Sequence, residues 1–338
     1  MRIVFDAKRY FHNSRGLGNY SRDVVRLIRE YAPGWEVVLM DKNGLGRSFM
    51  NIPPCDIYHG LSGELPFTVG RSQARSVVTM HDAIFIRYPE LYSPTYRWLF
   101  TQKVRFACKA ADTIIAISEQ TKRDMIEFFH ADESKIRVVY QGCSNIFRQP
   151  VSAEQIAEAK KKYDLPENYL LDVGAMEPRK NLKKLIQAMA AAKIDLPLVA
   201  IGGHSKYADE AAVLAQQSGV TLLLRHGVPF ADFPAIYKGA EVLCYPSIFE
   251  GFGIPILEAM CVGTPVLTST GSCFAETGGE AALYANPLDI EEIGAQLNRI
   301  LTNNHLRQEM VAKGAVQANR FTDEQVAKNL IRVLQEPK

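Results

Sequence analysis

Short apolar runs alternate with longer amphipathic stretches along most of the chain. In the first half, the runs with the length and composition of buried strands are 2–5, 36–40, 57–59, 77–80 and 113–117. The stretches between them that place apolar residues most clearly at helical spacing are 18–31, 94–110 and 119–129. Strands that alternate with helices in this way form a parallel sheet with helices on both faces. The first half of the chain is therefore predicted to be a doubly wound α/β domain.

The same alternation starts again in the second half. The further predicted strands are 169–173, 198–201, 220–224, 242–245 and 266–268, and from Ile290 onward only helix is expected. A chain of 338 residues is long for one hydrophobic core and sufficient for two. Residues 144–152 contain Pro150 and show little periodicity, so they are the candidate linker. We predict two Rossmann-like α/β domains, 1–150 and 151–321.

This architecture predicts where a ligand binds. Parallel sheets of open α/β domains bind ligands outside the carboxyl ends of their strands. Two such sheets that face one another create a cleft between the domains. The motifs that carry polar or glycine residues all follow predicted strands, so we expect their side chains at this cleft.

The first of these motifs follows the strand 242–245 and begins at Ser247. Its sequence is Ser-Ile-Phe-Glu-Gly-Phe-Gly-Ile-Pro-Ile-Leu-Glu-Ala-Met, and Pro255 suits the first turn of a helix. Gly251 and Gly253 allow backbone N–H groups to approach a ligand, and the positive end of the helix dipole favours phosphate there. Phe252 and Ile254, which lie in the same turn, are expected to belong to the same binding site. This turn is therefore predicted to bind the phosphates of a nucleotide.

Two carboxylates flank that turn. Glu258 lies one turn inside the predicted helix, where it can accept hydrogen bonds from both hydroxyls of a ribose attached to the same phosphates. Glu250 precedes the glycines and is expected near the other end of the ligand. Arg179 and Lys180 follow the strand 169–173, from which both cations can hold a diphosphate and stabilise the charge that develops on it.

Other interpretations of these residues exist. Arg179 and Lys180 are also compatible with a surface pair at the start of a helix. No Asp-x-Asp pair occurs in the chain, so no metal site of that simple type is expected. Gly16-Leu17-Gly18-Asn19-Tyr20-Ser21 imitates a dinucleotide fingerprint, but residues 7–15 separate it from the first strand, which disfavours a hydride-transfer enzyme.

The motifs taken together resemble the retaining GT-B glycosyltransferases of family 4. The resemblance rests on Glu250, seven intervening residues and Glu258, together with segments that begin at Gly16, Thr79 and Gly174. In its amino-acid sequence, the stretch from His81-Asp82 to Ser93-Pro94 is most similar to mannosyltransferase-type members that build bacterial surface polysaccharides. The resemblance implies the GT-B architecture, with a C-terminal helix within 322–338 that crosses back onto the first domain.

The resemblance also implies roles for individual residues. His81 and Glu250 are expected to hold the transferred sugar, and Arg179 and Lys180 to stabilise the leaving diphosphate. Donor contacts are implied for Gly16, Gly18, Arg179, Lys180, Gly251, Phe252, Gly253, Ile254 and Glu258. The acceptor-side candidates are Asp82, Asn19 and Tyr20. The nucleoside diphosphate sugar is a substrate, so no cofactor and no metal are expected.

The expected reaction is transfer of a hexose to a saccharide or lipid-diphosphate-linked acceptor, with retention implied by the resemblance alone. Mannose from GDP-mannose is the favoured donor, with UDP-glucose or another UDP-hexose as the alternative. A sugar-nucleotide epimerase and a non-catalytic nucleotide-sugar-binding subunit also remain open.

Charge and composition add a possible membrane partner. Lys and Arg exceed Asp and Glu in residues 1–150, and the reverse holds in the remainder. Aromatic and basic residues interleave at 96–100 and 103–106, which suits contact with an anionic membrane, although a solvated surface accounts for the charge equally well. No nucleic-acid-binding motif accompanies the charge. The chain starts with a strand rather than a signal peptide, and its cysteines lack zinc-ligand spacing, so a cytoplasmic protein with reduced thiols is expected. A peripheral position at the inner face of the cell membrane is the alternative location.

Overall fold

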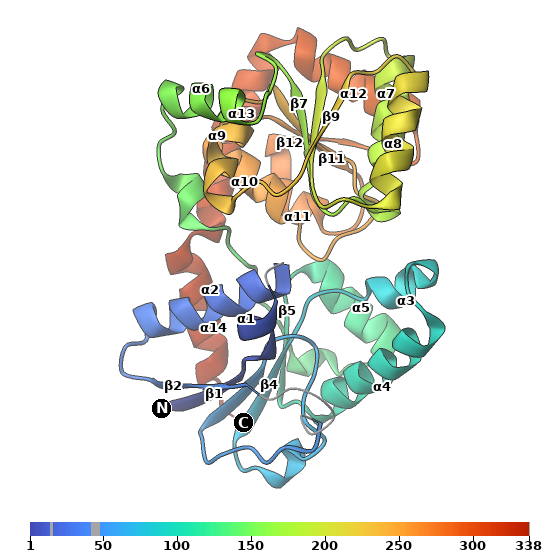
Figure 1. Ribbon diagram of the computed structural model, residues 1–338. Helices are drawn as coiled ribbons and strands as arrows, with labels where there is room; N and C mark the ends of the chain where they lie inside the picture. Colours follow the sequence, from blue (N-terminus) through green and yellow to red (C-terminus); the bar gives the residue numbers. More distant parts are fainter. Residues whose placement is uncertain (14–15, 42–47, 338) are drawn as a thin grey trace. The chain divides into compact units, whose positions relative to one another are not determined.

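The computed structural model describes residues 1–13, 16–41 and 48–337, and the chain divides into two compact units (Figure 1). The first unit comprises Met1–Gln141 and Thr322–Lys338, and the second comprises Gly142–Phe321. The division lies at Gln141 rather than at residue 150, so the segment predicted as a linker belongs to the second unit. In the described residues each unit contains one six-stranded sheet, and all strand pairs are parallel. The predicted α/β class with two Rossmann-like domains is confirmed.

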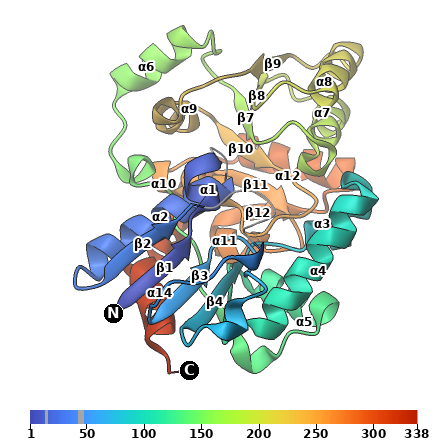
Figure 2. The ribbon, with the colours of Figure 1, turned by 60° about the horizontal axis from the view of Figure 1, so that its bottom comes forward.

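The sheet of the first unit has the strand order β2-β1-β3-β4-β5-β6. Its strands are β1 (Arg2–Asp6), β2 (Glu36–Met40), β3 (Ile57–Gly60), β4 (Arg75–Met80), β5 (Thr113–Ala116) and β6 (Ile136–Val138). The helices are α1 (Lys8–His12), α2 (Gly16–Tyr31), α3 (Ile84–Arg87), α4 (Pro94–Ala110), α5 (Glu119–Phe129) and α14 (Asp323–Gln335). Figure 2 shows β1, β3 and β4 side by side. The strand order reverses between β1 and β3, which makes their carboxyl ends the switch point at which such sheets bind ligands.

The sheet of the second unit has the order β12-β11-β10-β7-β8-β9 and reverses between β7 and β10. Its strands are β7 (Leu170–Val173), β8 (Leu198–Ile201), β9 (Leu222–Arg225), β10 (Val242–Tyr245), β11 (Val266–Ser269) and β12 (Ala282–Ala285). The helices are α6 (Ala153–Lys162), α7 (Leu182–Ala191), α8 (Lys206–Gln217), α9 (Phe233–Lys238), α10 (Ile254–Val262), α11 (Phe274–Gly278), α12 (Ile290–Thr302) and α13 (Asn304–Ala318). This is the strand order of dinucleotide-binding sheets.

The sequence-based prediction missed the edge strands β6 and β12. Both are short, and each pairs with a single neighbour, β5 or β11. Ile136-Arg137-Val138 has too few residues to show a period, and the alanines at both ends of β12 carry little strand preference. Their pairing with a neighbouring strand, rather than local sequence, decides their conformation.

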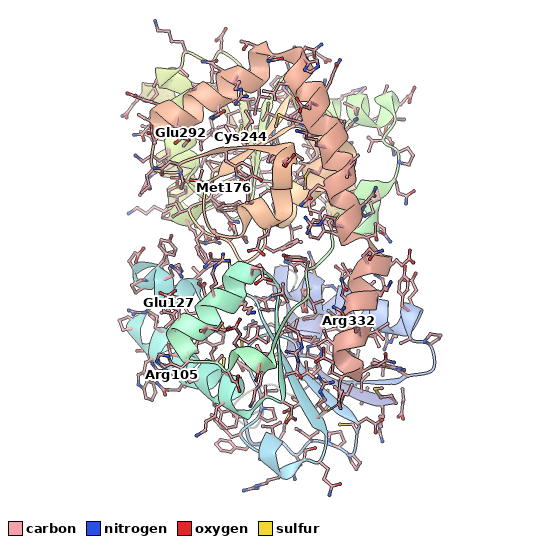
Figure 3. All side chains as sticks on the ribbon, turned by 180° about the vertical axis from the view of Figure 1, so that it is seen from behind. Arg105, Glu127, Met176, Cys244, Glu292 and Arg332 are labelled. Atoms are coloured by element: carbon pink, nitrogen blue, oxygen red, sulfur yellow. The ribbon has the colours of Figure 1, made fainter. Side chains whose placement is uncertain are left out.

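Each unit has its own hydrophobic core around its sheet. Strands β3, β4, β5, β8, β10 and β11 are buried along their whole length, as expected for parallel strands covered on both faces. Figure 3 shows Met176 and Cys244 among the interior side chains of the second unit, whereas Arg105 and Glu127 lie on exposed helix faces of the first. All six cysteines have free thiols.

The C-terminal helix α14 packs against α2 in the first unit (Figure 1). Val326 and Ala327 form an apolar cluster with Leu27 of α2. Arg26 donates to the carboxylate of Asp323 at 2.7 Å, and the buried Arg75 donates to the backbone carbonyl of Leu334 at 2.9 Å. The segment most distant in sequence from β1 therefore completes the surface of the same unit. No helix in the described residues has the length and apolar character needed to cross a bilayer.

The buried position of Leu330 in α14 makes a stability prediction. Leu330 is 1% exposed, and truncation to alanine leaves a cavity, so Leu330→Ala should lower the free energy of unfolding by about 2–5 kcal/mol. Denaturant titration followed by circular dichroism measures this. Leu99→Ala in the same unit is the control, because Leu99 is 51% exposed and its truncation should change stability by less than about 0.5 kcal/mol. Equal effects of the two substitutions would contradict the observed packing of α14.

Candidate functional site

The backbone after β7 brings two cations to the switch point of the second sheet. The chain turns at Gly174 and forms a short 3₁₀ helix, η6 (Pro178–Lys180), before α7. A Cβ atom at Gly174 would lie 3.3 Å from Cε of Lys180, so glycine leaves room for this side chain to fold back over the end of the strand. Asn181 follows in the left-handed conformation with φ 67°, which asparagine tolerates better than most residues.

The side chain of Asn181 fixes this turn to its neighbours. It is buried, and its amide nitrogen donates to the carbonyls of Pro246 at 3.0 Å and Pro287 at 2.6 Å. Pro246 follows β10, and Pro287 follows β12. These hydrogen bonds therefore fix the loops at the carboxyl ends of these strands to the turn that carries Arg179 and Lys180.

Arg179 and Lys180 converge on one carboxylate. Oε1 of Glu250 accepts from Nζ of Lys180 at 2.6 Å and lies 2.7 Å from Nη1 of Arg179. Lys180 also donates to the hydroxyl of Tyr245 at 2.7 Å, and Arg179 donates to the carbonyl of Phe249 at 2.6 Å. The structure thus brings together three of the predicted catalytic residues, at the carboxyl ends of β7 and β10.

Opposite charges shift the pKa values of Glu250 and Arg179. Burial alone would raise the pKa of Glu250, but the charges of Lys180 and Arg179 lower it to about 2. Burial opposes the charged form of Arg179 as well, and the adjacent Glu250 more than compensates, so the pKa of Arg179 is raised. Arg179 also donates to the carboxylate of Glu177 at 2.6 Å, so this cluster contains two cations and two carboxylates.

The loop from Glu250 to Gly253 is shaped by contacts to its backbone. Ser272 donates its hydroxyl to the carbonyl of Glu250 at 2.9 Å, and Thr277 donates to the carbonyl of Phe252. The side chain of Phe252 is 2% exposed and packs edge-on against Phe321, with ring centroids 5.4 Å apart. Phe252 therefore anchors the loop, and only its backbone remains for a ligand.

Helix α10 begins directly after this loop. Gly253 occupies the N-cap position with φ 94°, a conformation that favours glycine, and Ile254 is the first helical residue. Gly251 lies in the loop before it. The helix thus starts where the position of Pro255 predicted, with its N-terminal end at this loop.

Glu258 is placed differently from Glu250. It is 7% exposed, and its Oε2 accepts a hydrogen bond of 2.7 Å from the hydroxyl of Tyr237 in α9, rather than from Arg179 or Lys180. Burial raises the pKa of Glu258 to about 7, and the hydrogen bond from Tyr237 opposes this shift. This carboxyl group is therefore poised to lose its proton near neutral pH.

His81 lies in the first unit, directly after β4. Its Nε2 lies 2.9 Å from the carbonyl oxygen of Leu61, so Nε2 carries the hydrogen and Nδ1 is an acceptor. Burial lowers its pKa to about 4, the hydrogen bond to Leu61 opposes this, and the charge of Arg9 adds to it. Tyr20 packs edge-on against the ring, with centroids 4.6 Å apart. His81 is thus a neutral, oriented imidazole.

The remaining predicted residues of the first unit lie in or near helices. Gly16, Gly18, Asn19 and Tyr20 belong to α2, which starts two residues before the helix predicted over 18–31. A Cβ atom at Gly18 would lie 1.7 Å from the carbonyl oxygen of Asn13, so close backbone packing accounts for this glycine. Tyr20 is buried and bonds Thr79, Asn19 accepts from Arg22, and Asp82 accepts from the backbone of Ile84 at the start of α3.

Sequence reasoning missed several residues that shape the site. Tyr245 and Tyr237 hydrogen-bond Lys180 and Glu258, and Asp172 lies buried in β7 with its pKa raised to about 7 by burial, against the charge of Lys180. Tyrosines in apolar runs carry no local signal of function. The only available signal was Asp172, a carboxylate inside an otherwise apolar strand.

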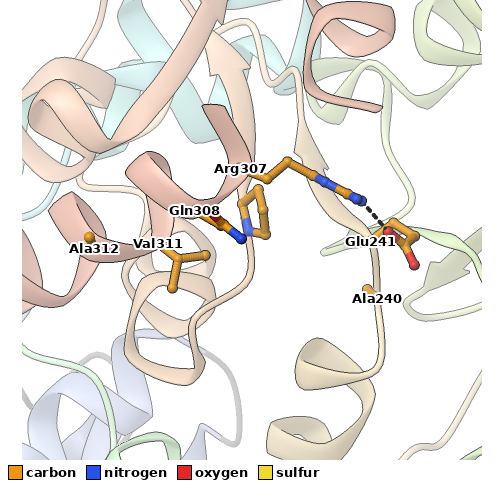
Figure 4. A pocket seen from close by; sticks show the side chains of 7 residues that line it. Ala240, Glu241, Arg307, Gln308, Val311 and Ala312 are labelled. Atoms are coloured by element: carbon orange, nitrogen blue, oxygen red, sulfur yellow. Dashed lines mark hydrogen bonds and ion pairs between the residues drawn. The ribbon is translucent and has the colours of Figure 1, made fainter. Parts of the chain in front are cut away.

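The second unit also contains a hollow that does not include the predicted site residues (Figure 4). Its volume is about 410 Å³, and it is lined by Ala240, Glu241, Pro265, Arg307, Gln308, Val311 and Ala312. Residues 240, 241 and 265 precede β10 and β11, so the hollow lies at the amino ends of these strands. Arg307 and Glu241 form an ion pair within it. It is therefore at the edge of the sheet opposite to the cluster of Arg179, Lys180 and Glu250.

Comparison with known proteins agrees with this geometry. Residues 153–317 match the family model described as Glycosyl transferases group 1, and residues 15–144 match the model Glycosyltransferase Family 4. Among curated proteins, the chain is 32% identical over 279 residues to O-antigen chain mannosyltransferase B of Escherichia coli, covering 79% of this chain and 70% of that protein. It is 28% identical over 323 residues to the serotype-specific mannosyltransferase WbdA of E. coli, covering 92% of this chain and 37% of WbdA. The chain thus spans only about a third of the length of WbdA.

Solved structures agree at the level of the fold. Sucrose-phosphate synthase from Thermosynechococcus elongatus has a TM-score of 0.80 at 19% identity, with 99% of this chain and 98% of that chain covered. Anabaena Alr3699/HepE in complex with UDP-glucose has a TM-score of 0.78 at 18% identity, with 99% of both chains covered. The family matches, the identity to a mannosyltransferase and the shared two-sheet architecture lead to one conclusion: the chain is a glycosyltransferase of the group 1, family 4 type with the GT-B fold.

Proposed function

We propose that this protein is a retaining hexosyltransferase that moves mannose from GDP-mannose to a saccharide or lipid-diphosphate-linked acceptor during synthesis of an O-antigen type of polysaccharide. The names of its relatives, which include an O-antigen chain mannosyltransferase of E. coli, support the sugar and the pathway class. A UDP-hexose donor is the alternative. The observation that carries the proposal is the cluster in which Lys180 and Arg179 share the carboxylate of Glu250 at the switch point.

The cluster suits a diphosphate leaving group. As the bond from the anomeric carbon to the diphosphate oxygen breaks, negative charge grows on that oxygen. Lys180 and Arg179 are held in place beforehand, so they stabilise this charge without reorganisation in the transition state. We propose that these two cations take the role that a divalent metal has in other transferases. Glu250, which positions both, is then the carboxylate nearest the transferred sugar.

The nucleoside is assigned to α10. The N–H groups at its start receive phosphate oxygens, and Glu258 further along the helix accepts hydrogen bonds from the ribose hydroxyls. The hydroxyl of Tyr237, at 2.7 Å, holds one carboxylate oxygen and leaves the other for the ribose. We assign selectivity for the base to contacts made by loops.

Retention is assigned to substitution on one face of the sugar. A two-step route needs a carboxylate on the face opposite the leaving group, and no residue of the cluster is assigned that role. In the proposed route, the acceptor hydroxyl attacks the anomeric carbon as the diphosphate leaves. Its proton passes to the departing diphosphate oxygen. Neutral His81 then accepts a hydrogen bond from a sugar hydroxyl through Nδ1.

A membrane contact is proposed for the outer face of α4. Trp98 is 66% exposed and Leu99 is 51% exposed, although both are large apolar side chains. Arg105 and Lys109 follow Trp98 at helical spacing and are also exposed, so the same face offers apolar and basic groups. This combination favours the surface of an anionic bilayer, where lipid-linked acceptors reside.

Removal of one cation tests the mechanism. Lys180→Ala should lower kcat about 100- to 1000-fold, because the developing diphosphate charge loses a preorganised donor. The melting temperature should change little, since Arg179 still neutralises Glu250. Transfer from GDP-mannose is followed by GDP release. Lys183→Ala is the matched control, because this lysine pairs with Glu210 on the surface of the same unit. Turnover equal to that of the control would remove Lys180 from the mechanism.

The raised pKa of Glu258 predicts how donor binding depends on pH. Ribose hydroxyls donate to a carboxylate, so binding below the pKa of about 7 must first release the proton of Glu258. Affinity for the donor should therefore rise by up to about tenfold per pH unit below this pKa and level off above it. The diphosphate of a sugar nucleotide is esterified at both ends and does not titrate in this range.

Thermal stabilisation by GDP-mannose, UDP-glucose and ADP-glucose measures this effect and identifies the donor. A ligand at a hundred times its dissociation constant stabilises a protein by about 2.7 kcal/mol. Glu258→Gln should weaken binding and remove its pH dependence, whereas Glu291→Gln on exposed α12 should do neither. A pH profile that survives in Glu258→Gln would contradict the ribose assignment. Donor hydrolysis by the wild type separates an enzyme from a non-catalytic binding subunit.

Vesicle binding tests the proposed membrane face. Wild-type protein should sediment with phosphatidylglycerol vesicles more than with phosphatidylcholine vesicles, and added salt should weaken the binding. Replacement of both Trp98 and Leu99 by alanine should reduce vesicle affinity at least about tenfold, because each buries a large apolar side chain in the interface. Phe230→Ala is the control, since Phe230 is 46% exposed in the second unit. Unchanged binding of the double variant would rule this face out.

A further inference from the structure

Two of the six free cysteines lie next to one another in the second unit. Cys143 follows Gly142, the first residue of this unit, and Cys261 lies in the last turn of α10. Their Sγ atoms are 3.5 Å apart, which is within hydrogen-bond distance for sulfur. The two residues are 118 positions apart in the sequence, so the fold rather than local sequence brings them together.

The segment that carries Cys143 is held in place by packing. The short 3₁₀ helix η5 (Asn145–Arg148) packs against α10. Phe147 is fully buried and packs edge-on against Tyr237 of α9, with ring centroids 5.5 Å apart. Arg148 donates to two backbone carbonyls at and just after the end of α13, at 2.9 and 3.0 Å. A covalent bond therefore requires only that the two sulfur atoms approach from 3.5 Å to about 2.05 Å.

The two thiols differ in how readily they ionise. The hydrogen bond that Cys143 donates lowers the pKa of Cys261, and the charge of Arg148 adds to this effect, whereas burial and Glu258 oppose it. The same hydrogen bond and burial raise the pKa of Cys143. Cys261 is also partly exposed, whereas Cys143 is only 4% exposed. Because the thiolate is the reactive form of cysteine, Cys261 is the nucleophile of the pair.

The other four cysteines lack this combination of features. Burial raises the pKa of each of their thiols. Three of them, Cys108, Cys244 and Cys273, are buried, and Cys55 is partly exposed. An oxidant in solution is therefore expected to react first at Cys261, and Cys55 is the natural comparison because its exposure is similar and its pKa is shifted in the opposite direction.

We propose that Cys143 and Cys261 are a redox-active pair that a peroxide converts into a reversible intramolecular disulfide. The thiolate of Cys261 attacks the O–O bond of hydrogen peroxide, which gives a sulfenic acid and releases hydroxide. The sulfur of Cys143 then attacks the sulfur of Cys261. The S–S bond forms, the S–O bond breaks, and the hydroxyl group leaves as water with the proton of Cys143. Two thiols lose two electrons in total, and one peroxide is reduced to two molecules of water once the hydroxide is protonated.

The disulfide has two consequences. It ties the segment at which the chain enters the second unit to α10, the helix that carries Glu258. It also protects Cys261, because Cys143 consumes the sulfenic acid before further peroxide can oxidise it irreversibly to the sulfinic acid. A low-molecular-weight thiol reverses the reaction by thiol–disulfide exchange. The pair is independent of the proposed transferase reaction, since it includes none of the residues assigned to the donor.

Mass spectrometry on the full, folded chain tests the pair. After treatment with hydrogen peroxide and alkylation of the remaining thiols, a digest without reductant should contain peptides linked through Cys143 and Cys261. Dithiothreitol should remove this link. Cys261 should react at least about threefold faster than Cys55, because each unit by which a pKa falls raises the thiolate fraction up to tenfold and lowers its nucleophilicity about threefold.

Serine variants assign the two roles. Cys143→Ser should lose the disulfide and accumulate sulfenic acid, trapped by dimedone, and then sulfinic acid at Cys261. Cys143→Ala, which removes the thiol without adding a hydroxyl group, should behave in the same way. Cys261→Ser should leave Cys143 reduced, because that thiol is buried and its pKa is raised. Cys55→Ser is the matched control and should form the disulfide as the wild type does. Circular dichroism verifies that each variant is folded.

The outcomes decide the proposal. A link between Cys143 and Cys261 in the folded wild type and in Cys55→Ser, with sulfinic acid at Cys261 in the folded Cys143 variants, supports the pair. Absence of this link from the oxidised wild type overturns it, as does oxidation of Cys55 at the same rate as Cys261. A disulfide that forms only in denatured protein also overturns it, because the fold would then not bring the two thiols together.

Discussion

Two cations share one carboxylate at the point where the second sheet reverses its strand order. Glu250 lies between Lys180 and Arg179 in a largely buried position, and the two cations lower the pKa of this carboxylate to about 2. The rest of the local structure serves this arrangement. Gly174 makes room for the lysine, Asn181 ties its turn to the loops after β10 and β12, and Ser272 holds the backbone of Glu250. A leaving diphosphate would therefore meet charges that are already in place.

Two buried glutamates of the second unit have pKa values that are shifted in opposite directions. The pKa of Glu250 is lowered to about 2 by its cationic partners, whereas burial raises the pKa of Glu258 to about 7 in the absence of such partners. Glu250 and Glu258 are close in sequence and nevertheless have different protonation states near neutral pH. The difference arises from neighbours: Arg179 and Lys180 in η6, after β7, surround Glu250, whereas Tyr237 in α9 bonds Glu258.

The first unit uses a switch point as well, with different chemistry. Arg9, His81 and Asp82 line a hollow of about 140 Å³ there, together with the stacked rings of Tyr92, Tyr96 and Phe100, so its lining combines polar and aromatic groups. Helix α4 contributes to the lining of this hollow. Tyr96 and Phe100 line the hollow, and Trp98 and Leu99 are exposed on the helix. The C-terminal helix α14 stabilises this unit through contacts made by residues more than two hundred positions from those they touch.

By itself, the sequence determined the alternation of strands and helices, the two-sheet fold class and the position of the charged motifs after strands. Hydrophobic periodicity and strand length are local, so ten of the twelve strands in the described residues were predictable; β6 and β12 were not, because pairing at a sheet edge decides their conformation. Arg179, Lys180 and Glu250 were predictable as a set from their motifs. Only the tertiary structure decided that Glu250 binds both cations, that Glu258 instead bonds Tyr237, that Gly18 packs inside a helix, and that Arg9 and Tyr96 line one hollow. These facts depend on side chains from distant segments, whose proximity local sequence patterns do not encode.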